Sequence, residues 1–342
     1  MVRQIREMAD TTRQTHAPDD NVLTHIVGAP ELSALDEPLA PREAFLKAYP
    51  AVVLAARTLR APAVIATAVS PSGQVVEAPR VIFDRRSLIL GRHTQCGLRL
   101  PGSAISLRHL AALVRFEEGR QVLRLWDLGT GLHFVTEDGE ESAALIATGP
   151  VYVAVGGYAL WFVPVPMASA SRLPDRAGEV FDALPPRVFL DRRSPSPERP
   201  SAPWPPRGIA GEDTCTFVTS VAPALLLGDD DAPEVAWGSL RLERGPLRQE
   251  RGVSAERLER GILVGRYERC GLLLSDDRGE ISRVHVLLVR IGTEVWALHT
   301  ASTNGLFRGD AAVEAEVLHD EDALTLGGEV TLRWRRAEHP DA

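Results

Sequence analysis

The chain repeats itself, and this internal duplication constrains its fold more than any other feature of the sequence. The segment GRHTQCGLRL at 91–100 matches GRYERCGLLL at 265–274, with the glycines, the arginine and the cysteine in register. ISLRHLAALVR at 105–115 then matches ISRVHVLLVR at 281–290, and VAVGGYALWF at 153–162 resembles LTLGGEVTLRW at 324–334. Three matches in the same order predict two copies of one structural unit.

Each copy has the pattern of short β-strands. Over 330–335, apolar residues alternate with Thr331, Arg333 and Arg335, which is the period of a strand with one buried face. The apolar runs Ala111–Val114 and Val286–Val289 are too short for helices and suit the interior of a two-sheet sandwich. Glycine-containing turns recur about every ten residues, as in such sandwiches. The sequence therefore predicts an all-β fold with two β-sandwich domains.

Proline marks the boundaries of these domains. Between Pro164 and Pro233 lie 13 of the 25 prolines, so we expect a Pro-rich linker over 168–234. The sandwiches are then expected at 59–167 and 235–338, after an N-terminal extension over 1–58 that is polar and short-helical or irregular. Within this extension the stretch 41–59 is helix-like, although Pro50 is expected to interrupt it.

Composition excludes several classes of protein. The net charge of −8 argues against binding to nucleic acid. Three cysteines cannot form a disulfide framework, the start of the chain lacks the apolar core of a secretory signal, and no apolar run approaches the ~18 residues of a membrane span. We expect a cytoplasmic protein that binds neither nucleic acid nor membrane. Because Lys47 is the only lysine, any anion site is expected to use arginine.

The second copy carries polar residues at the ends of its expected strands. Arg266 offers a planar, permanently charged fork for two phosphate oxygens, and Ser282 adds a hydroxyl donor. Arg283 is a second cation, and Asn304 has both a donor and an acceptor for a peptide backbone. Together they suit a phosphoamino acid, which carries about −1.5 to −2 charges and three acceptor oxygens.

The same residues resemble a known family. Gly265-Arg266, Ser282-x-x-His285 and Ser302-Thr303-Asn304-Gly305, in that order, are similar to the motifs of the forkhead-associated (FHA) domain. The resemblance implies a β-sandwich that binds phosphothreonine peptides through loops at one end. It also implies phosphate contacts from Arg266 and Ser282 with help from Arg283, a peptide clamp at Thr303 and Asn304, and structural support from Gly265, His285 and Gly305. His299-Thr300-Ala301 departs from the Asp-Leu-Gly that often precedes this motif, which we expect to affect packing rather than the site.

The first copy keeps only part of this set. Arg92, Ser106 and His109 are present, and Arg108 adds a cation one position later than Arg283 does. No asparagine follows in the segment 130–133 that replaces the second copy's clamp. Two hypotheses remain open: a weaker second phosphate site, or a packing or protein-contact role.

Catalytic and metal sites find little support in the sequence. Ser106 with His109, or Ser282 with His285, suggests a hydrolase, but no G-x-S-x-G elbow or orienting acid accompanies either pair. No His/Cys pair has zinc spacing. The cysteines at 96 and 270 are interpreted as buried small side chains rather than thiolates. We expect no enzyme activity, no metal and no cofactor.

The linker contains threonines that follow acidic residues. In some relatives of the resembled family a phosphorylated threonine in a preceding tail docks on the domain. Thr214 and Thr216 are therefore candidate phosphoacceptors that would occupy the Arg266 site in the same or a second molecule, with a tether that raises the effective concentration. The simpler alternative is that they are ordinary linker residues.

Taken together, the motifs and the resemblance predict an adaptor in Ser/Thr kinase signalling. Its expected partners are threonine-phosphorylated proteins and a Ser/Thr protein kinase. The competing hypothesis is a scaffold that uses the sandwich faces and the linker regardless of phosphorylation. The sequence leaves open the oligomeric state and whether the two sandwiches pack together.

Overall fold

The computed structural model describes residues 37–166, 174, 176–194, 225–227, 236–274 and 279–337. The candidate phosphoacceptors Thr214 and Thr216 lie outside the described residues. Both copies belong to one compact unit, Glu31–Ala342. Among the residues described, no helix has the length and apolarity required to cross a membrane.

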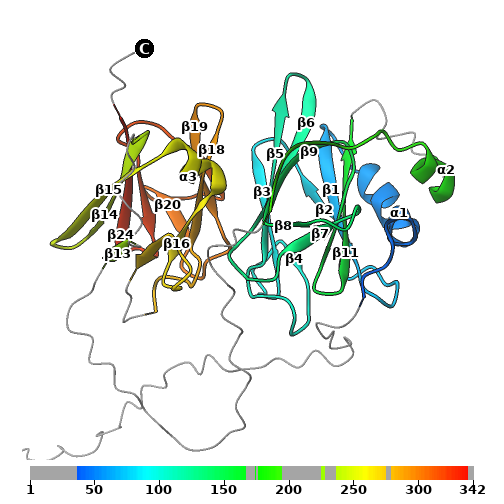
Figure 1. The fold of residues 1–342 in the computed structure, drawn as a ribbon, viewed down its shortest axis with the longest axis horizontal. Coiled ribbons are helices and arrows are strands. Elements are labelled where there is room, and N and C mark those ends of the chain that lie inside the picture. The colour runs from blue at the N-terminus through cyan, green and yellow to red at the C-terminus, as the bar shows by residue number, and fades with distance from the viewer. Residues whose placement is uncertain are drawn as a thin grey trace, which may run out of the picture. The chain divides into compact units, whose positions relative to one another are not determined.

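The first copy forms a sandwich of two six-stranded sheets, ordered β2-β1-β11-β10-β7-β8 and β12-β9-β6-β5-β3-β4 (Figure 1). Apolar side chains from both sheets fill the space between them, among them Leu90, Leu110, Val153 and Leu160. The strands are β1 (Ala63–Val69), β2 (Arg80–Ile82), β3 (Arg86–Gly91), β4 (Leu98–Arg99), β5 (Leu110–Glu117), β6 (Arg120–Asp127), β7 (Phe134–Thr136), β8 (Glu141–Ser142), β9 (Ala144–Thr148), β10 (Val151–Val155), β11 (Tyr158–Val165) and β12 (Val188–Arg193).

The second copy is a sandwich of the sheets β13-β17-β16-β18-β19-β22 and β15-β14-β24-β23-β20-β21. Val330, Leu332 and Trp334 are buried in its core while Arg335 on the same strand is exposed, so the alternation in the sequence reports a real strand. Its elements are β13 (Leu225–Leu227), β14 (Gly238–Arg244), β15 (Leu247–Val253), α3 (Ala255–Arg260), β16 (Ile262–Gly265), β17 (Leu272–Leu274), β18 (Val286–Ile291), β19 (Glu294–His299), β20 (Leu306–Arg308), β21 (Ala311–Ala312), β22 (Ala315–Leu318), β23 (Ala323–Leu326) and β24 (Val330–Arg336). The all-β prediction is confirmed.

The duplication in the sequence is also a duplication in strand pairing. β3 runs parallel to β4 with Leu90 opposite Leu98, and β16 runs parallel to β17 with Val264 opposite Leu272. In each copy the first of these strands then pairs antiparallel with the strand after the Ser-x-x-His motif, β5 or β18. Matching residues therefore occupy matching places in the two sandwiches.

Two short helices cover the outer face of the first sandwich. α1 (Pro41–Ala56) buries Phe45, Tyr49 and Val52 in a cluster with Trp161 of β11, and α2 (Ala177–Asp182) packs beside it (Figure 1). The expectation that Pro50 interrupts α1 is wrong, because the helix continues to Ala56. Pro50 is exposed, so it removes one backbone hydrogen bond without disturbing the buried face that holds the helix in place.

Part of the expected linker belongs to the first sandwich. β12 pairs antiparallel with β9, Arg193 lying opposite Ala144, and so extends the sheet by one strand. Pro185 and Pro186 lie before β12, so they take no hydrogen-bond donor away from its pairing with β9, whose register shifts once, between Phe189 and Asp191. The high proline content of residues 168–234 as a whole therefore did not indicate this strand of six residues.

The runs Ala111–Val114 and Val286–Val289 are apolar without interruption because their strands are buried on both faces. In β5, Leu110, Ala112 and Val114 face the sandwich's own core, whereas Ala111 and Leu113 face the other way. The outward side chains join an apolar cluster shared by the two sandwiches. It contains Ile89, Cys96, Ala111, Leu113, Trp126, Leu128 and Ala144 from the first, and Leu287, Val289, Ile291, Trp296, Leu298 and Ala301 from the second. Both faces of these strands are therefore buried, and the sandwiches pack together.

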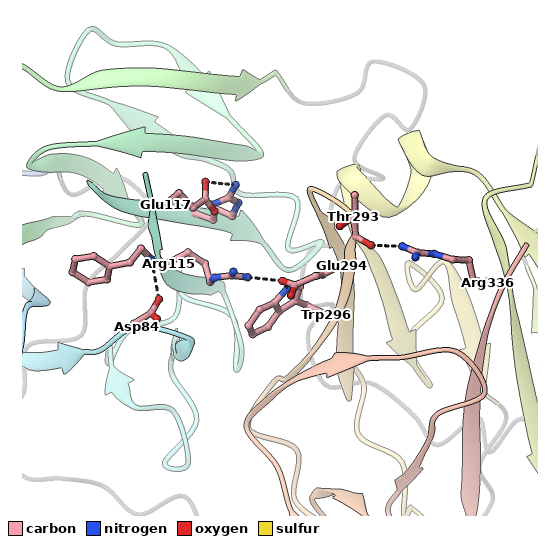
Figure 2. A network of polar contacts seen from close by, with 9 residues as sticks. Asp84, Arg115, Glu117, Thr293, Glu294, Trp296 and Arg336 are labelled. Atoms are coloured by element: carbon pink, nitrogen blue, oxygen red, sulfur yellow. Dashed lines mark hydrogen bonds and ion pairs between the residues drawn. The ribbon is translucent and has the colours of Figure 1, made fainter. Parts of the chain in front are cut away.

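Polar contacts border this shared cluster. Arg115 of β5 pairs with Glu294 of β19 at 2.9 Å, and its guanidinium lies 4.6 Å from the ring centroid of Trp296 (Figure 2). Arg86 also pairs with Glu314, at 3.5 Å, but both side chains are largely exposed. The buried apolar contacts are thus the main source of stability here, because exposed ion pairs contribute little.

Candidate functional site

Gly265 brings the two loops of the candidate site into contact. The backbone N–H of Arg266 donates to the carbonyl of Ser282 at 3.1 Å, and that of Tyr267 donates to the carbonyl of Arg283 at 3.0 Å. A Cβ atom on Gly265 would lie 2.3 Å from the Arg283 carbonyl oxygen. Glycine is therefore required by this close backbone approach, which places Arg266 beside Ser282.

We expect Gly265→Ala to destabilise the second sandwich by about 2–3 kcal/mol, the cost of forcing an atom into a packed site. The matched control is Gly271→Ala, because the nearest atom to a Cβ there is Cγ2 of the Ile262 side chain, at 3.3 Å, and the nearest backbone atom lies at 3.9 Å. Urea denaturation measures both variants. Equal stability of Gly265→Ala and the wild type would contradict the steric argument.

His285 connects the Ser282 loop to the loop that contains Asn304. It is fully buried, and its Nδ1 accepts the backbone N–H of Ser282 at 3.2 Å. Nε2 therefore carries the proton and donates to the carbonyl of Gly305 at 2.8 Å. Gly305 has φ +77°, a left-handed conformation that favours glycine. Through these contacts His285 and Gly305 hold the two loops together.

The loop from Ser302 to Asn304 lies against the Ser282 loop. The backbone N–H of Thr303 donates to Ser282 Oγ at 3.1 Å, and Asn304 Nδ2 donates to the carbonyl of Glu280 at 3.0 Å. The N–H of Ser302 donates to His299 Nε2 at 2.9 Å. Burial lowers the pKa of His299, which keeps this nitrogen an acceptor. Thr303 and Asn304 thus lie beside the Ser282 loop, although Thr303 is 21 residues away from Ser282 in sequence.

Two cations lie at the surface of this cluster. Arg266 and Arg283 are both exposed, and no carboxylate among the described residues pairs with either guanidinium. Many other arginines of the chain, such as Arg241 and Arg244, do pair with a glutamate. The acidic chain therefore carries a local excess of positive charge next to hydroxyl and amide donors.

Comparison with known proteins identifies the second sandwich. The family model described as FHA domain matches residues 262–327. These residues form an FHA domain. The resemblance inferred from the Gly-Arg, Ser-x-x-His and Ser-Thr-Asn-Gly motifs is confirmed for this copy, while no curated protein matches the chain.

Solved FHA domains are also similar to part of this chain. The FHA-1 domain of a Mycobacterium tuberculosis protein is 20% identical over 30% of this chain and 100% of its own, with a TM-score of 0.24. The FHA domain of a Chlamydia trachomatis protein is 19% identical over 30% of this chain and 98% of its own, with a TM-score of 0.26. The FHA domain of an Arabidopsis thaliana protein is 19% identical over 34% of this chain and 99% of its own, with a TM-score of 0.26.

The first sandwich repeats the loop frame of the FHA domain. The N–H of Arg92 donates to the carbonyl of Ser106 at 2.9 Å, and a Cβ on Gly91 would lie 2.5 Å from the Leu107 carbonyl oxygen. His109 accepts the N–H of Ser106 at 3.1 Å through Nδ1, and its Nε2 lies 2.8 Å from the carbonyl oxygen of Leu132. Arg92, Ser106 and His109 are therefore brought together as Arg266, Ser282 and His285 are.

Arg108 does not join this first group. Its side chain is buried at 8% exposure and donates to the carbonyl of Ala301 in the FHA domain, from Nε at 2.9 Å and from Nη2 at 2.5 Å. Of the two hypotheses for the first copy, this contact of Arg108 favours a protein-contact role for that residue over a phosphate site. Arg108 stands one position after the place equivalent to Arg283, so its side chain points toward the neighbouring sandwich.

The two described cysteines support the same loops in both copies. Cys96 Sγ donates to the carbonyl of Leu107 at 3.2 Å, and Cys270 Sγ donates to that of Arg283 at 3.3 Å. Burial raises the pKa of Cys96 to about 11 and that of Cys270 to about 12, so both remain thiols. The sequence analysis did not predict this loop contact, although the equivalent positions of the two cysteines in the repeat indicate a shared structural role. No group of three or more metal-ligating side chains occurs among the residues that the structure describes.

Proposed function

We propose that this protein is a phosphothreonine-dependent adaptor in Ser/Thr kinase signalling. FHA domains are binding modules for phosphopeptide-dependent protein interaction, not enzymes. The observation that carries the proposal for this chain is the pair Arg266 and Arg283, two exposed guanidinium groups without a carboxylate partner among the described residues. They lie on a loop frame that also presents Ser282, Thr303 and Asn304.

The chemistry of these groups matches a phosphothreonine peptide. Arg266 offers a bidentate fork to two phosphate oxygens, and Arg283 adds a second charge to balance a dianion. Ser282 Oγ accepts the N–H of Thr303 and retains its own hydrogen for the phosphate. Asn304 uses Nδ2 within the protein, which leaves Oδ1 to accept a backbone N–H of the peptide.

The partners would be threonine-phosphorylated proteins and the Ser/Thr kinase that modifies them. Thr214 and Thr216 would be internal ligands of the same site if they are phosphorylated.

The geometry does not favour a hydrolase. His285 Nδ1 accepts the backbone N–H of Ser282, and its Nε2 lies 2.8 Å from the Gly305 carbonyl oxygen and 2.9 Å from Ser302 Oγ. The hydroxyl oxygen of Ser282 accepts the backbone N–H of Thr303. Both ring nitrogens are thus engaged with backbone groups, an arrangement unlike that of a base that takes the proton of a nucleophilic serine.

A peptide library tests the proposal. The full chain is titrated with fluorescent peptides that contain threonine or phosphothreonine in otherwise identical sequences. We expect binding of phosphorylated members only, weakened by added salt because the contacts involve exposed charges. Binding that ignores phosphorylation would instead support a scaffold that uses the sandwich faces.

A further inference from the structure

Arg108 of the first sandwich holds a loop of the FHA domain. Its guanidinium donates twice to one carbonyl, that of Ala301, at 2.9 and 2.5 Å. Ala301 directly precedes Ser302, Thr303 and Asn304, which form one side of the candidate phosphopeptide site. The contact therefore joins a residue of the divergent copy to the base of the binding loop.

Ala301 is a place where such support is needed. It is a non-glycine residue with φ +55°, a conformation that is unfavourable for a residue with a Cβ. The equivalent position of the first copy is Gly129, with φ +71°. Alanine persists in this conformation only where its surroundings impose it. Two hydrogen bonds from a charged donor to the Ala301 carbonyl supply such a constraint.

The arginine is not required by the sandwich fold itself. In the alignment of the two copies Arg108 corresponds to Val284, which is buried at 6% exposure in the FHA domain. The same position of the same frame is thus filled by an apolar side chain in one copy and by an arginine in the other. The arginine differs from the valine in reaching the neighbouring domain.

Two residues at equivalent positions of the two copies, Gln95 and Arg269, make equivalent contacts between the sandwiches. The side-chain amide of Gln95 lies 3.2 Å from the carbonyl oxygen of Ala301, and the amide nitrogen donates to it in the orientation that satisfies both groups. Its equivalent Arg269 donates to the carbonyl of Gly129 at 3.4 Å. Each copy thus touches the matching carbonyl of the other, and Arg108 adds a contact on the FHA side that has no counterpart.

The environment of Arg108 makes this placement costly. No carboxylate among the described residues pairs with its guanidinium, and burial together with the nearby charge of Arg283 lowers its pKa. A buried cation held by a carbonyl alone is unfavourable compared with a valine at the same place. Its specific contact therefore points to a role beyond packing.

We propose that Arg108 is a positioning residue that holds residues 301–304 of the FHA domain in their binding conformation, so that the two sandwiches form one phosphopeptide-binding unit. This inference rests on the proposed function of the Arg266 site. The first copy would then serve as a support for the second site rather than as a second reader.

The experiment uses three variants of the full chain. Arg108→Val introduces the residue of the other copy, and Arg108→Lys keeps the charge and a donor. Arg115→Met is the matched control, because Arg115 lies at the other end of β5 and contacts Glu294, away from the binding loop. The measurements are phosphothreonine-peptide affinity and amide hydrogen exchange of Ser302 and Thr303.

Arg108→Val is expected to weaken peptide binding about tenfold, mainly through faster dissociation, as for loss of a hydrogen bond to a charged group. Exchange at Ser302 and Thr303 is expected to rise by about the same factor, with partial recovery in Arg108→Lys. Arg115→Met is expected to change neither quantity at this loop.

Several results would overturn the inference. Wild-type protection of Ser302 and Thr303 in Arg108→Val would show that the loop needs no support from the first sandwich. Loss of protection throughout β18 and β19 would show a general role at the interface instead. If the wild type binds no phosphopeptide, the proposed function fails, whereas the exchange measurement still decides the role of Arg108.

Discussion

Replacing Arg266 with alanine is expected to weaken binding of a threonine-phosphorylated peptide about a hundredfold or more. The guanidinium is exposed and has no carboxylate partner among the described residues, so its charge is available to the phosphate. Losing one partner of a close charge pair typically costs 2–5 kcal/mol, of which about 2.7 kcal/mol already corresponds to a hundredfold. Fluorescence anisotropy with a labelled phosphopeptide measures the change.

Two further variants sharpen this prediction. Arg266→Lys keeps the charge but loses the planar fork, and we expect it to recover only a small part of the affinity. Arg92→Ala removes the equivalent residue of the first sandwich and is expected to leave most of the affinity intact. Equal losses in Arg92→Ala and Arg266→Ala would contradict the assignment of the site to the FHA domain alone.

Replacing Trp296 with alanine is expected to destabilise the packed sandwiches by about 3–5 kcal/mol, the usual cost of removing a buried aromatic side chain. Trp296 is 1% exposed, belongs to the apolar cluster shared by the two sandwiches, and lies under the guanidinium of Arg115 (Figure 2). Because its side chain faces the other domain rather than its own core, the loss falls on the contact between domains.

The expected signature is a change in cooperativity. With the shared cluster intact, we expect the two sandwiches to unfold together, and in Trp296→Ala we expect two separate calorimetric transitions. The matched control is Trp334→Ala, because Trp334 is buried in the second sandwich's own core. That variant is expected to lower the stability of the FHA domain without changing the first sandwich. A single transition at the wild-type temperature in Trp296→Ala would contradict the importance of the shared cluster.

Residues whose role depends on local geometry could be predicted from the sequence. Gly265, Ser282 and His285 act through contacts between adjacent loops of one sandwich, and their spacing is repeated in the first copy. The alternation over 330–335 likewise reports a strand, because the burial of successive side chains on opposite faces is a property of the strand alone.

Residues whose role depends on the neighbouring domain could not be predicted in the same way. Arg108 lies close in sequence to Ser106 and His109, but its side chain donates to Ala301 across the interface. The runs Ala111–Val114 and Val286–Val289 have apolar residues on both faces because a second sandwich covers the outer face. A single chain segment does not indicate which surface lies opposite it.

By itself, the sequence determined the duplication, the sandwich fold and the set of loop residues that forms the candidate site, because each depends on short-range periodicity and on motifs repeated in register. Only the tertiary structure decided that the sandwiches share an apolar cluster, that β12 extends the first of them, and that Arg108 supports the second. These features depend on which surfaces meet in three dimensions, and burial between distant segments leaves no periodic signal in the chain.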